Sequence, residues 1–161
     1  MSNIQTMLTI GAMLLLALVS LNFNSTVLNT STSDMESKIY LTAFSISDNL
    51  IEEIKQKSFD QSTIDFPTTN TASLTPPASL GPEAGETYPN YNDVDDYNGF
   101  KDTVTAPYFE TYYVSCSVEY VDSNDPDAAS STQTFYKKVT VTVNSPFLRH
   151  SVSLSSIFTL K

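Results

Sequence analysis

The chain has 161 residues, a formal net charge of −10, one cysteine, one histidine and no tryptophan. This length provides one domain's worth of core, and a single cysteine excludes an intrachain disulfide. With eight basic residues against eighteen acidic ones, nucleic acid is not expected as a partner, because binding phosphate needs a basic face.

The first 33 residues contain no charged side chain. Within them, Ile4–Phe23 is an apolar run of about twenty residues, which as a helix spans ~30 Å and is long enough to cross a bilayer. Because apolar surface is stabilised when it leaves water, this segment needs a partner that covers it.

Three interpretations of the apolar segment differ in what covers it. A cleaved signal peptide has a basic start and a small-residue cleavage site, whereas no Lys or Arg precedes this run and Asn22–Asn24 follows it. A permanent membrane anchor usually has flanking basic residues, but the first one here is Lys38. A helix that waits in the membrane and then packs against copies of itself in a fibre explains both features, and we expect this third case. The expected assembly residues are Ile4, Gln5, Met7, Leu8, Ile10, Met13, Leu14, Leu15, Leu16, Leu18, Val19, Leu21 and Phe23.

A second segment, from Asp34 to about residue 57, has the pattern of an amphipathic helix. Its apolar residues recur at steps of three or four, which is typical of a helix with one buried face. They are Met35, Ile39, Ala43, Ile46, Leu50 and Ile54, with Phe44 and Ile51 widening the stripe. One continuous helix over about 1–57 would be ~85 Å long. Its weakest part is the Asn-, Ser- and Thr-rich stretch 22–33, whose side chains compete for backbone hydrogen bonds.

Residues 58–107 are predicted to form a long loop, because six of the eight prolines and three of the four glycines fall there. An acidic block overlaps the loop: Glu83–Asp127 contains eleven acidic residues and one lysine. We interpret this block as a solvated surface.

The last third of the chain, 108–161, is predicted to be β. Apolar and polar residues alternate along Tyr112–Tyr120, Val139–Val143 and Val152–Leu160, which indicates strands with one buried face. Turn-rich connections favour an antiparallel meander of three or four strands. The predicted fold is therefore α+β, with an apolar helix at 1–33 and a head at 34–161 made of helix 34–57, loop 58–107 and meander 108–161.

This layout resembles the type IV pilin and pseudopilin family. The segment Asp93-Val-Asp-Asp-Tyr-Asn-Gly99, followed by a strand such as Lys137–Val143, is also similar to pilin-like proteins of that superfamily. The chain departs from the family in three ways. No basic leader stands ahead of Met1, and Gln5 occupies the place of the family's glutamate when Met1 is the mature start. Asn22 replaces a common proline.

The resemblance implies a structural subunit of an extracellular pilus-like filament. The subunit would be inserted in the inner membrane before assembly and would then join a helical homopolymer. A single-pass membrane-anchored surface domain and a secreted binding module are the alternatives. In the filament, Gln5 is expected to hydrogen-bond to a neighbouring helix through Thr9 or a backbone carbonyl.

Residues suited to chemistry are sparse, so we expect no enzyme activity, no cofactor and no metal. Cys116 lies mid-strand on the apolar face and is interpreted as a buried core residue, and His150 lies in a turn. Asp93, Asp95 and Asp96 are a weaker Ca²⁺ candidate, because Tyr97 and Gly99 do not fit the EF-hand loop. The aromatic residues Tyr108, Phe109, Tyr112 and Tyr113 are interpreted as strand packing rather than as a sugar-stacking surface.

Overall fold

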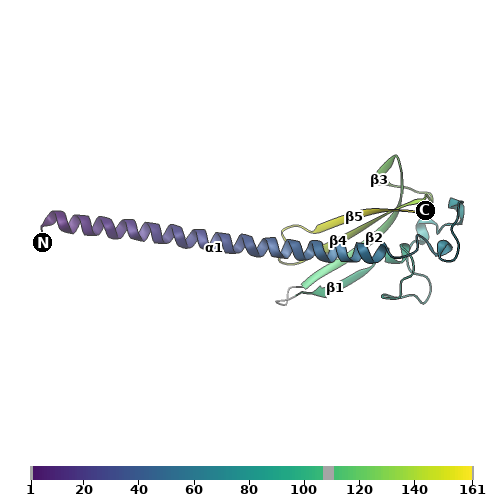
Figure 1. The fold of residues 1–161 in the computed structure, drawn as a ribbon, viewed down its shortest axis with the longest axis horizontal. Helices are drawn as coiled ribbons and strands as arrows, with labels where there is room; N and C mark the ends of the chain where they lie inside the picture. Colours follow the sequence, from purple (N-terminus) through teal and green to yellow (C-terminus); the bar gives the residue numbers. More distant parts are fainter. Residues whose placement is uncertain (1, 107–110, 161) are drawn as a thin grey trace. The chain divides into compact units, whose positions relative to one another are not determined.

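The computed structural model describes residues 2–106 and 111–160, and only the backbone of residues 28–32. It has an α+β fold, with one long helix, α1 (Asn3–Ile54), and one antiparallel sheet (Figure 1). The predicted fold class is confirmed. The chain divides into an N-terminal unit, Met1–Ile39, and a C-terminal unit, Tyr40–Lys161, so that α1 contributes to both.

The helix α1 covers most of the range predicted for it. The Asn-, Ser- and Thr-rich stretch 22–33, predicted to be its weakest part, keeps a helical backbone. The hydroxyl groups of Ser25 and Thr26 donate to the carbonyl oxygen of Asn22, at 2.9 Å each. These polar side chains therefore satisfy their hydrogen bonds within the helix.

The sheet contains five strands. They are β1 (Lys101–Thr105), β2 (Thr111–Asp122), β3 (Asp125–Ala129), β4 (Tyr136–Asn144) and β5 (Val152–Thr159). The spatial order is β1-β2-β4-β5, and β3 pairs with the end of β2. The predicted meander corresponds to β2, β4 and β5, which are neighbours and antiparallel.

Two strands lie where connections were predicted, and the sequence prediction is wrong at these places. β1 falls within the predicted loop 58–107, and four of its five residues are exposed. β3 falls within the turn-rich connection after β2 and is exposed throughout. Neither strand shows apolar alternation, because neither presents an apolar face to the core.

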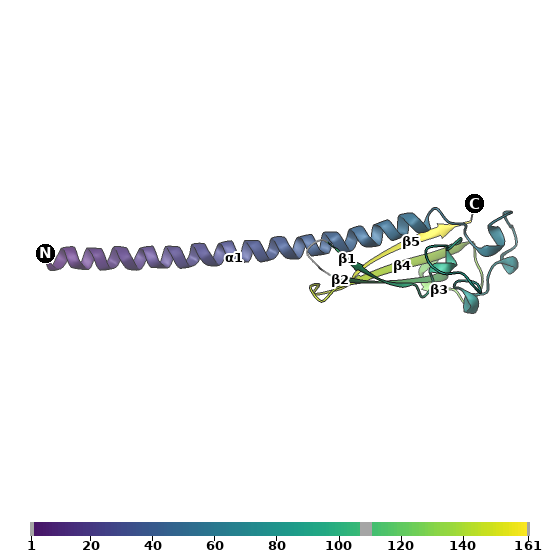
Figure 2. The same cartoon turned by 90° about the horizontal axis from the view of Figure 1, so that it is seen from below.

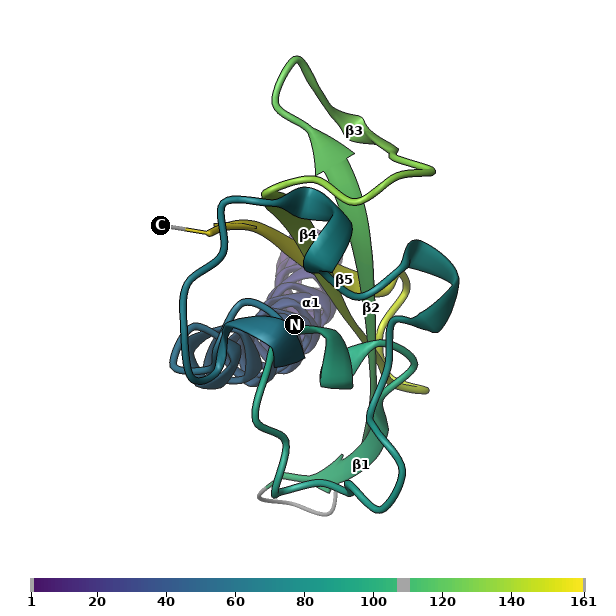
Figure 3. The ribbon, with the colours of Figure 1, turned by 90° about the vertical axis from the view of Figure 1, so that its right-hand side faces the viewer.

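The core lies between one face of the sheet and residues 40–54 of α1, which run along that face (Figures 2 and 3). The register places valines and one cysteine of β2 opposite valines of β4. The buried pairs are Val114 with Val143, Cys116 with Val141, and Val118 with Val139. On α1, Ala43, Leu50, Ile51 and Ile54 are buried. The alternation predicted for these strands is confirmed, and so is this part of the helix stripe.

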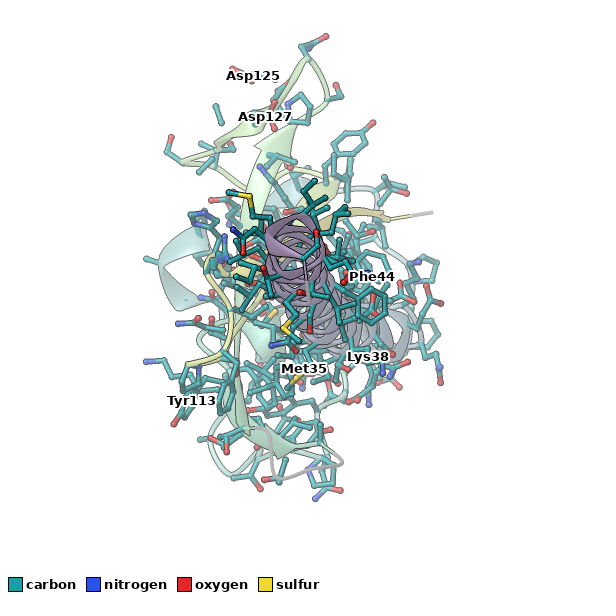
Figure 4. All side chains as sticks on the ribbon, turned by 90° about the vertical axis from the view of Figure 1, so that its left-hand side faces the viewer. Met35, Lys38, Phe44, Tyr113, Asp125 and Asp127 are labelled. Atoms are coloured by element: carbon teal, nitrogen blue, oxygen red, sulfur yellow. The ribbon has the colours of Figure 1, made fainter. Side chains whose placement is uncertain are left out.

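Two residues that were predicted to lie on the buried apolar stripe of the helix are exposed. Met35 and Phe44 are 58% and 48% exposed, and Figure 4 labels both. The buried stripe begins at Ile39, one turn after Met35. Phe44 follows the buried Ala43 and lies at the edge of the stripe, where a helical rotation of about 100° per residue turns it towards solvent.

The loop between α1 and β1 contains four short 3₁₀ helices and is fastened to the end of α1. They are η1 (Gln61–Thr63), η2 (Thr71–Ser73), η3 (Pro77–Ser79) and η4 (Asp95–Tyr97). The hydroxyl of Tyr97 donates to Glu53 Oε1 at 2.7 Å, and that of Tyr88 donates to Oε2 at 3.3 Å. The rings of Tyr88, Tyr91, Tyr97 and Phe100 pack together with centroids 4.9–6.3 Å apart. These contacts hold the loop in one place despite its proline content.

Candidate functional site

The predicted assembly residues lie on the part of α1 that belongs to the N-terminal unit. The twelve large apolar side chains among them, from Ile4 to Phe23, are 57–76% exposed. One stretch of α1, Asn3–Val27, is long and apolar enough to cross a membrane, and none of it is buried. A signal sequence has the same properties. An apolar surface of this extent needs a cover of lipid or of protein.

Gln5 takes part in the start of α1. Its Oε1 accepts the backbone N–H of Ser2 at 3.3 Å, and Ser2 Oγ accepts the backbone N–H of Ile4 at 3.3 Å. These two contacts cap the first turn of α1, with Ser2 as the N-cap residue. Thr9 Oγ1 donates to the carbonyl oxygen of Gln5 within the same helix, at 3.1 Å. The hydrogen bond from Gln5 to a neighbouring chain stays a prediction.

In the C-terminal unit, a lysine lies on the otherwise apolar face of β4. Lys137 is paired with Tyr120 of β2, and its side chain is fully buried. Its Nζ donates to Phe59 O at 2.8 Å, to Asp60 Oδ2 at 2.9 Å and to Asp95 Oδ1 at 2.7 Å. An ammonium group has three protons. All three have an acceptor here, as a buried charge requires.

Both carboxylate oxygens of Asp60, one partner of Lys137, also have hydrogen-bond donors. Its two oxygens accept hydrogen bonds of 2.9–3.2 Å from Ser62, Thr75, Tyr120 and Lys137. Burial disfavours the charged carboxylate, but Lys137, through its hydrogen bond and its positive charge, acts together with the hydrogen bonds from Thr75 and Ser62 to lower the pKa of Asp60. Asp60 and Lys137 thus form a complete buried ion pair.

The interpretation of the acidic block as solvated surface is wrong for three aspartates just before β1. Asp93, Asp95 and Asp96 are each 0% exposed. Other acidic residues of the block, such as Asp122 and Asp125, are exposed as predicted. The three aspartates lie in an irregular loop, where no side-chain periodicity reports burial.

We call Glu83, Glu86, Asn92, Asp93, Asp95 and Asp96 the acidic cluster. Its aspartates are oriented by backbone N–H groups around η4. Asp93 Oδ1 accepts the N–H groups of Asp95 and Asp96, at 2.8 and 3.3 Å. Asp96 Oδ2 accepts those of Asn92 and Asp93, at 2.8 and 3.2 Å. One oxygen of each of these two carboxylates is therefore fixed.

The two glutamates of the cluster come from a tight turn. The N–H of Glu86 donates to the carbonyl oxygen of Glu83 at 3.0 Å. Gly85 has φ of +97° at the third position of this turn, a conformation that favours glycine. Asn92 Nδ2 donates to Glu86 Oε1 at 2.5 Å. This contact joins the turn to the aspartates.

Five side-chain oxygens of the cluster are buried without a hydrogen-bond partner within the described part of the chain. They are Glu83 Oε2, Asn92 Oδ1, Asp93 Oδ2, Asp95 Oδ2 and Asp96 Oδ1. An unpaired buried acceptor costs about 1–3 kcal/mol. One carboxylate oxygen from each of Glu83, Asp93 and Asp95 lies within 4.8 Å of the other two, and the same holds for Glu83, Glu86 and Asp96. Oxygens in this arrangement could hold a metal ion.

The protonation of the cluster reflects this crowding. Burial, followed by the neighbouring carboxyl of Asp95, raises the pKa of Asp93 to about 9. Burial and the adjacent Glu86 raise the pKa of Glu83 to about 7. Without a further cation, the cluster therefore disfavours full ionisation at neutral pH.

The other residues that the sequence analysis considered for chemistry or binding do not lie together in one site. Cys116 is buried as predicted, and burial raises the pKa of its thiol to about 12. His150 is exposed between β4 and β5. Tyr112 is buried in the core, whereas Tyr113 is 52% exposed (Figure 4). Tyr108 and Phe109 lie outside the described residues.

Sequence reasoning missed Asp60, Lys137, Glu83, Glu86 and Asn92. For Lys137 a signal existed, because it stands two residues before Val139 and so has the parity of the buried valines. Asp60 also had a local signal, since it caps η1 and is followed by Thr63 in a capping box. Glu83, Glu86 and Asn92 had none, because only the folded loop brings them to the aspartates.

Comparisons of this chain with protein-family models, curated proteins and solved structures find no match. Function is therefore inferred from two features described above, the exposed apolar part of α1 and the acidic cluster.

Proposed function

We propose that the chain is the structural subunit of an extracellular helical filament that polymerises through the apolar part of α1. The observation that supports this is the exposure of twelve large apolar side chains between Ile4 and Phe23, at 57–76%. Complete burial of one such side chain contributes about 1.5–3 kcal/mol. Packing against copies of the same helix would cover them all.

The distribution of apolar residues favours a cover on every side of the helix. Met13–Leu16 is a run of four consecutive apolar residues, and so spans a full helical turn. A helix that is apolar all round is buried in a protein core or in lipid. The hydroxyl group of Thr9 donates to the helix's own carbonyl oxygens, at 2.9 and 3.1 Å. This polar group can therefore enter an apolar environment.

The charge pattern supports a filament subunit over a permanent anchor. No Lys or Arg lies between Ser2 and Lys38, although basic residues usually flank a single membrane span and set its orientation. We propose that the segment occupies the inner membrane only before assembly and then becomes the core of the fibre.

A single-pass anchor for a cell-surface domain is the second candidate function. It is favoured by the length of the apolar stretch, Asn3–Val27, because about twenty apolar residues match the hydrocarbon thickness of a bilayer. The two candidates differ in the final neighbour of the helix, which is protein in one case and lipid in the other.

The test is assembly of the purified full chain after detergent removal, with and without lipid vesicles, followed by electron microscopy. The wild-type chain is expected to form fibres. Leu15→Asp should form none, because a charge in the fibre core has no partner. Gln5→Ala should reduce the fibre yield only partly, since it removes a hydrogen bond of ~0.5–1.5 kcal/mol.

The matched control is Phe66→Asp, which introduces the same charge at a side chain that is 78% exposed in the loop of the C-terminal unit. It should leave the fibre yield unchanged. A wild-type chain that stays a soluble monomer in plain buffer would contradict both candidates. Recovery in vesicles without fibres would favour the membrane anchor.

A further inference from the structure

We propose that the acidic cluster binds Ca²⁺, with Glu83, Asp93 and Asp95 as central ligands and Asp96, Asn92 and Glu86 around them. This inference is independent of the proposed filament function. It rests on carboxylate oxygens that are buried, directed at one another and without a partner.

The first argument is the unpaired oxygens themselves. Asp93, Asp95 and Asp96 are 0% exposed, and one oxygen of each has no hydrogen-bond partner in the described residues. The buried Lys137 cannot supply one, since its three protons go to Phe59, Asp60 and Asp95 Oδ1. A cation from outside the chain would give these oxygens a partner, whereas without one the cluster must hold protons.

The second argument is the chemistry of the ligands. The unpaired atoms are four carboxylate oxygens and one amide oxygen, which are the hard donors that Ca²⁺ takes in sets of six to eight. Neither Cys116 nor His150, the chain's only residues of those types, belongs to the cluster. This absence of sulfur and nitrogen ligands disfavours Zn²⁺.

The third argument is size. The oxygens of each group of three lie within 4.8 Å of one another. Two oxygens on opposite sides of a Ca²⁺ ion are ~4.8 Å apart, because the Ca–O distance is about 2.4 Å. Mg²⁺ needs distances of about 2.0–2.1 Å in strict octahedral geometry, and it usually keeps several waters. Oxygens within 4.8 Å of one another can therefore all reach one Ca²⁺ ion, and a site supplied mainly by protein oxygens suits Ca²⁺ better than Mg²⁺.

The fourth argument is orientation. Asp93 and Asp96 each have one oxygen fixed by two backbone N–H groups, and Asp95 has one fixed by Lys137. Hydrogen bonds to the second oxygen of a ligand hold the first in place for a metal. Glu83 and Glu86 are half-buried, so an ion can enter on their side.

The test uses the full chain in detergent micelles after removal of metal with a chelator. Addition of 1 mM Ca²⁺ should raise the thermal unfolding midpoint by at least about 4 °C, and 1 mM Mg²⁺ by clearly less. Tb³⁺, an oxygen-seeking ion of similar size, gives a second readout. Because the chain has no tryptophan, tyrosines near the cluster should sensitise Tb³⁺ emission, and Ca²⁺ should quench it by displacement.

Two variants and one control locate the site. Asp93→Asn keeps the acceptor for the backbone N–H groups but loses the charge, and Glu83→Gln makes the same change at a half-buried residue. Each should weaken Ca²⁺ binding at least about tenfold. Asp125→Asn removes the same charge from an exposed position in β3 and should leave binding unchanged. If Asp93→Asn fails to fold, Glu83→Gln still decides.

Two results would overturn the proposal. One is a folded wild-type chain whose unfolding midpoint does not respond to Ca²⁺. The other is a response that is the same in wild type, Glu83→Gln and Asp125→Asn, since this would place the ion elsewhere on the acidic surface.

Discussion

Asp60 and the aspartates of the acidic cluster are equally buried, but they are stabilised differently. Asp60 has a lysine and several hydroxyl and amide donors on its two oxygens, whereas Asp93, Asp95 and Asp96 each keep one oxygen without a partner. Asp60 and Asp95 contact the same ammonium group of Lys137. The difference shows what one buried ammonium group can stabilise. Lys137 helps to give both oxygens of Asp60 a hydrogen-bond donor, but it reaches only one oxygen of Asp95.

The largest expected effect comes from removing Lys137. Lys137→Met leaves Asp60 and Asp95 buried without a counter-charge, and this should lower the free energy of unfolding by about 3–5 kcal/mol. Urea unfolding of the full chain in detergent measures it, with the sheet followed by circular dichroism.

Lys138→Met is the matched control for Lys137. Lys138 is the next residue in β4 and points to the other face, where its Nζ lies 3.9 Å from Glu119 and 3.5 Å from Asp127. Partly exposed pairs of this kind contribute about 0–1 kcal/mol. Equal losses in the two variants would show that Asp60 does not depend on its lysine.

A smaller, pH-dependent effect is expected for Asp60→Asn. The folded-state pKa of Asp60 is lowered from 3.8, so its ionisation stabilises the fold above that pH, and this contribution is lost as the pH falls through the folded value. The difference in unfolding free energy between wild type and Asp60→Asn should therefore be largest at neutral pH and shrink below about pH 4. Urea unfolding from pH 7 to pH 3 checks it, and a constant difference would contradict the role given to the charge.

The smallest effect is expected at Cys116, a buried group that needs no counter-ion because it is neutral. Its pKa of about 12 keeps the thiol protonated at pH 8. A thiol-specific reagent should therefore label unfolded chains but not folded ones. Cys116→Val should change the free energy of unfolding by less than ~1.5 kcal/mol. Rapid labelling of the native chain would mean that this part of the sheet opens.

The fold could be predicted wherever buried residues recur along the sequence with the repeat of a helix or a strand. Val139, Val141 and Val143 alternate with threonines, and this pattern alone predicts a strand with one buried face. β1 and β3 were not predictable in this way, because exposed strands are held by backbone hydrogen bonds and not by apolar side chains.

The candidate site was predictable only in part. Asp93, Asp95 and Asp96 are adjacent in the sequence and could be recognised as an acidic group, but their burial depends on contacts with Ser58 and β4. Glu83 joins them through the turn at Gly85. Contacts between residues so far apart in the chain are a property of the folded head, and no local pattern encodes them.

The unpaired edge of β3 bears on how molecules of this protein contact one another at high concentration. Within the described residues, β3 pairs only with β2, so its other edge is available to a strand of another molecule. The strand contains Pro126, which has no N–H to donate, between Asp125 and Asp127, whose charges repel an identical strand. At high protein concentration, these residues should therefore keep β3 from pairing with β3 of another molecule in a shared, amyloid-like sheet.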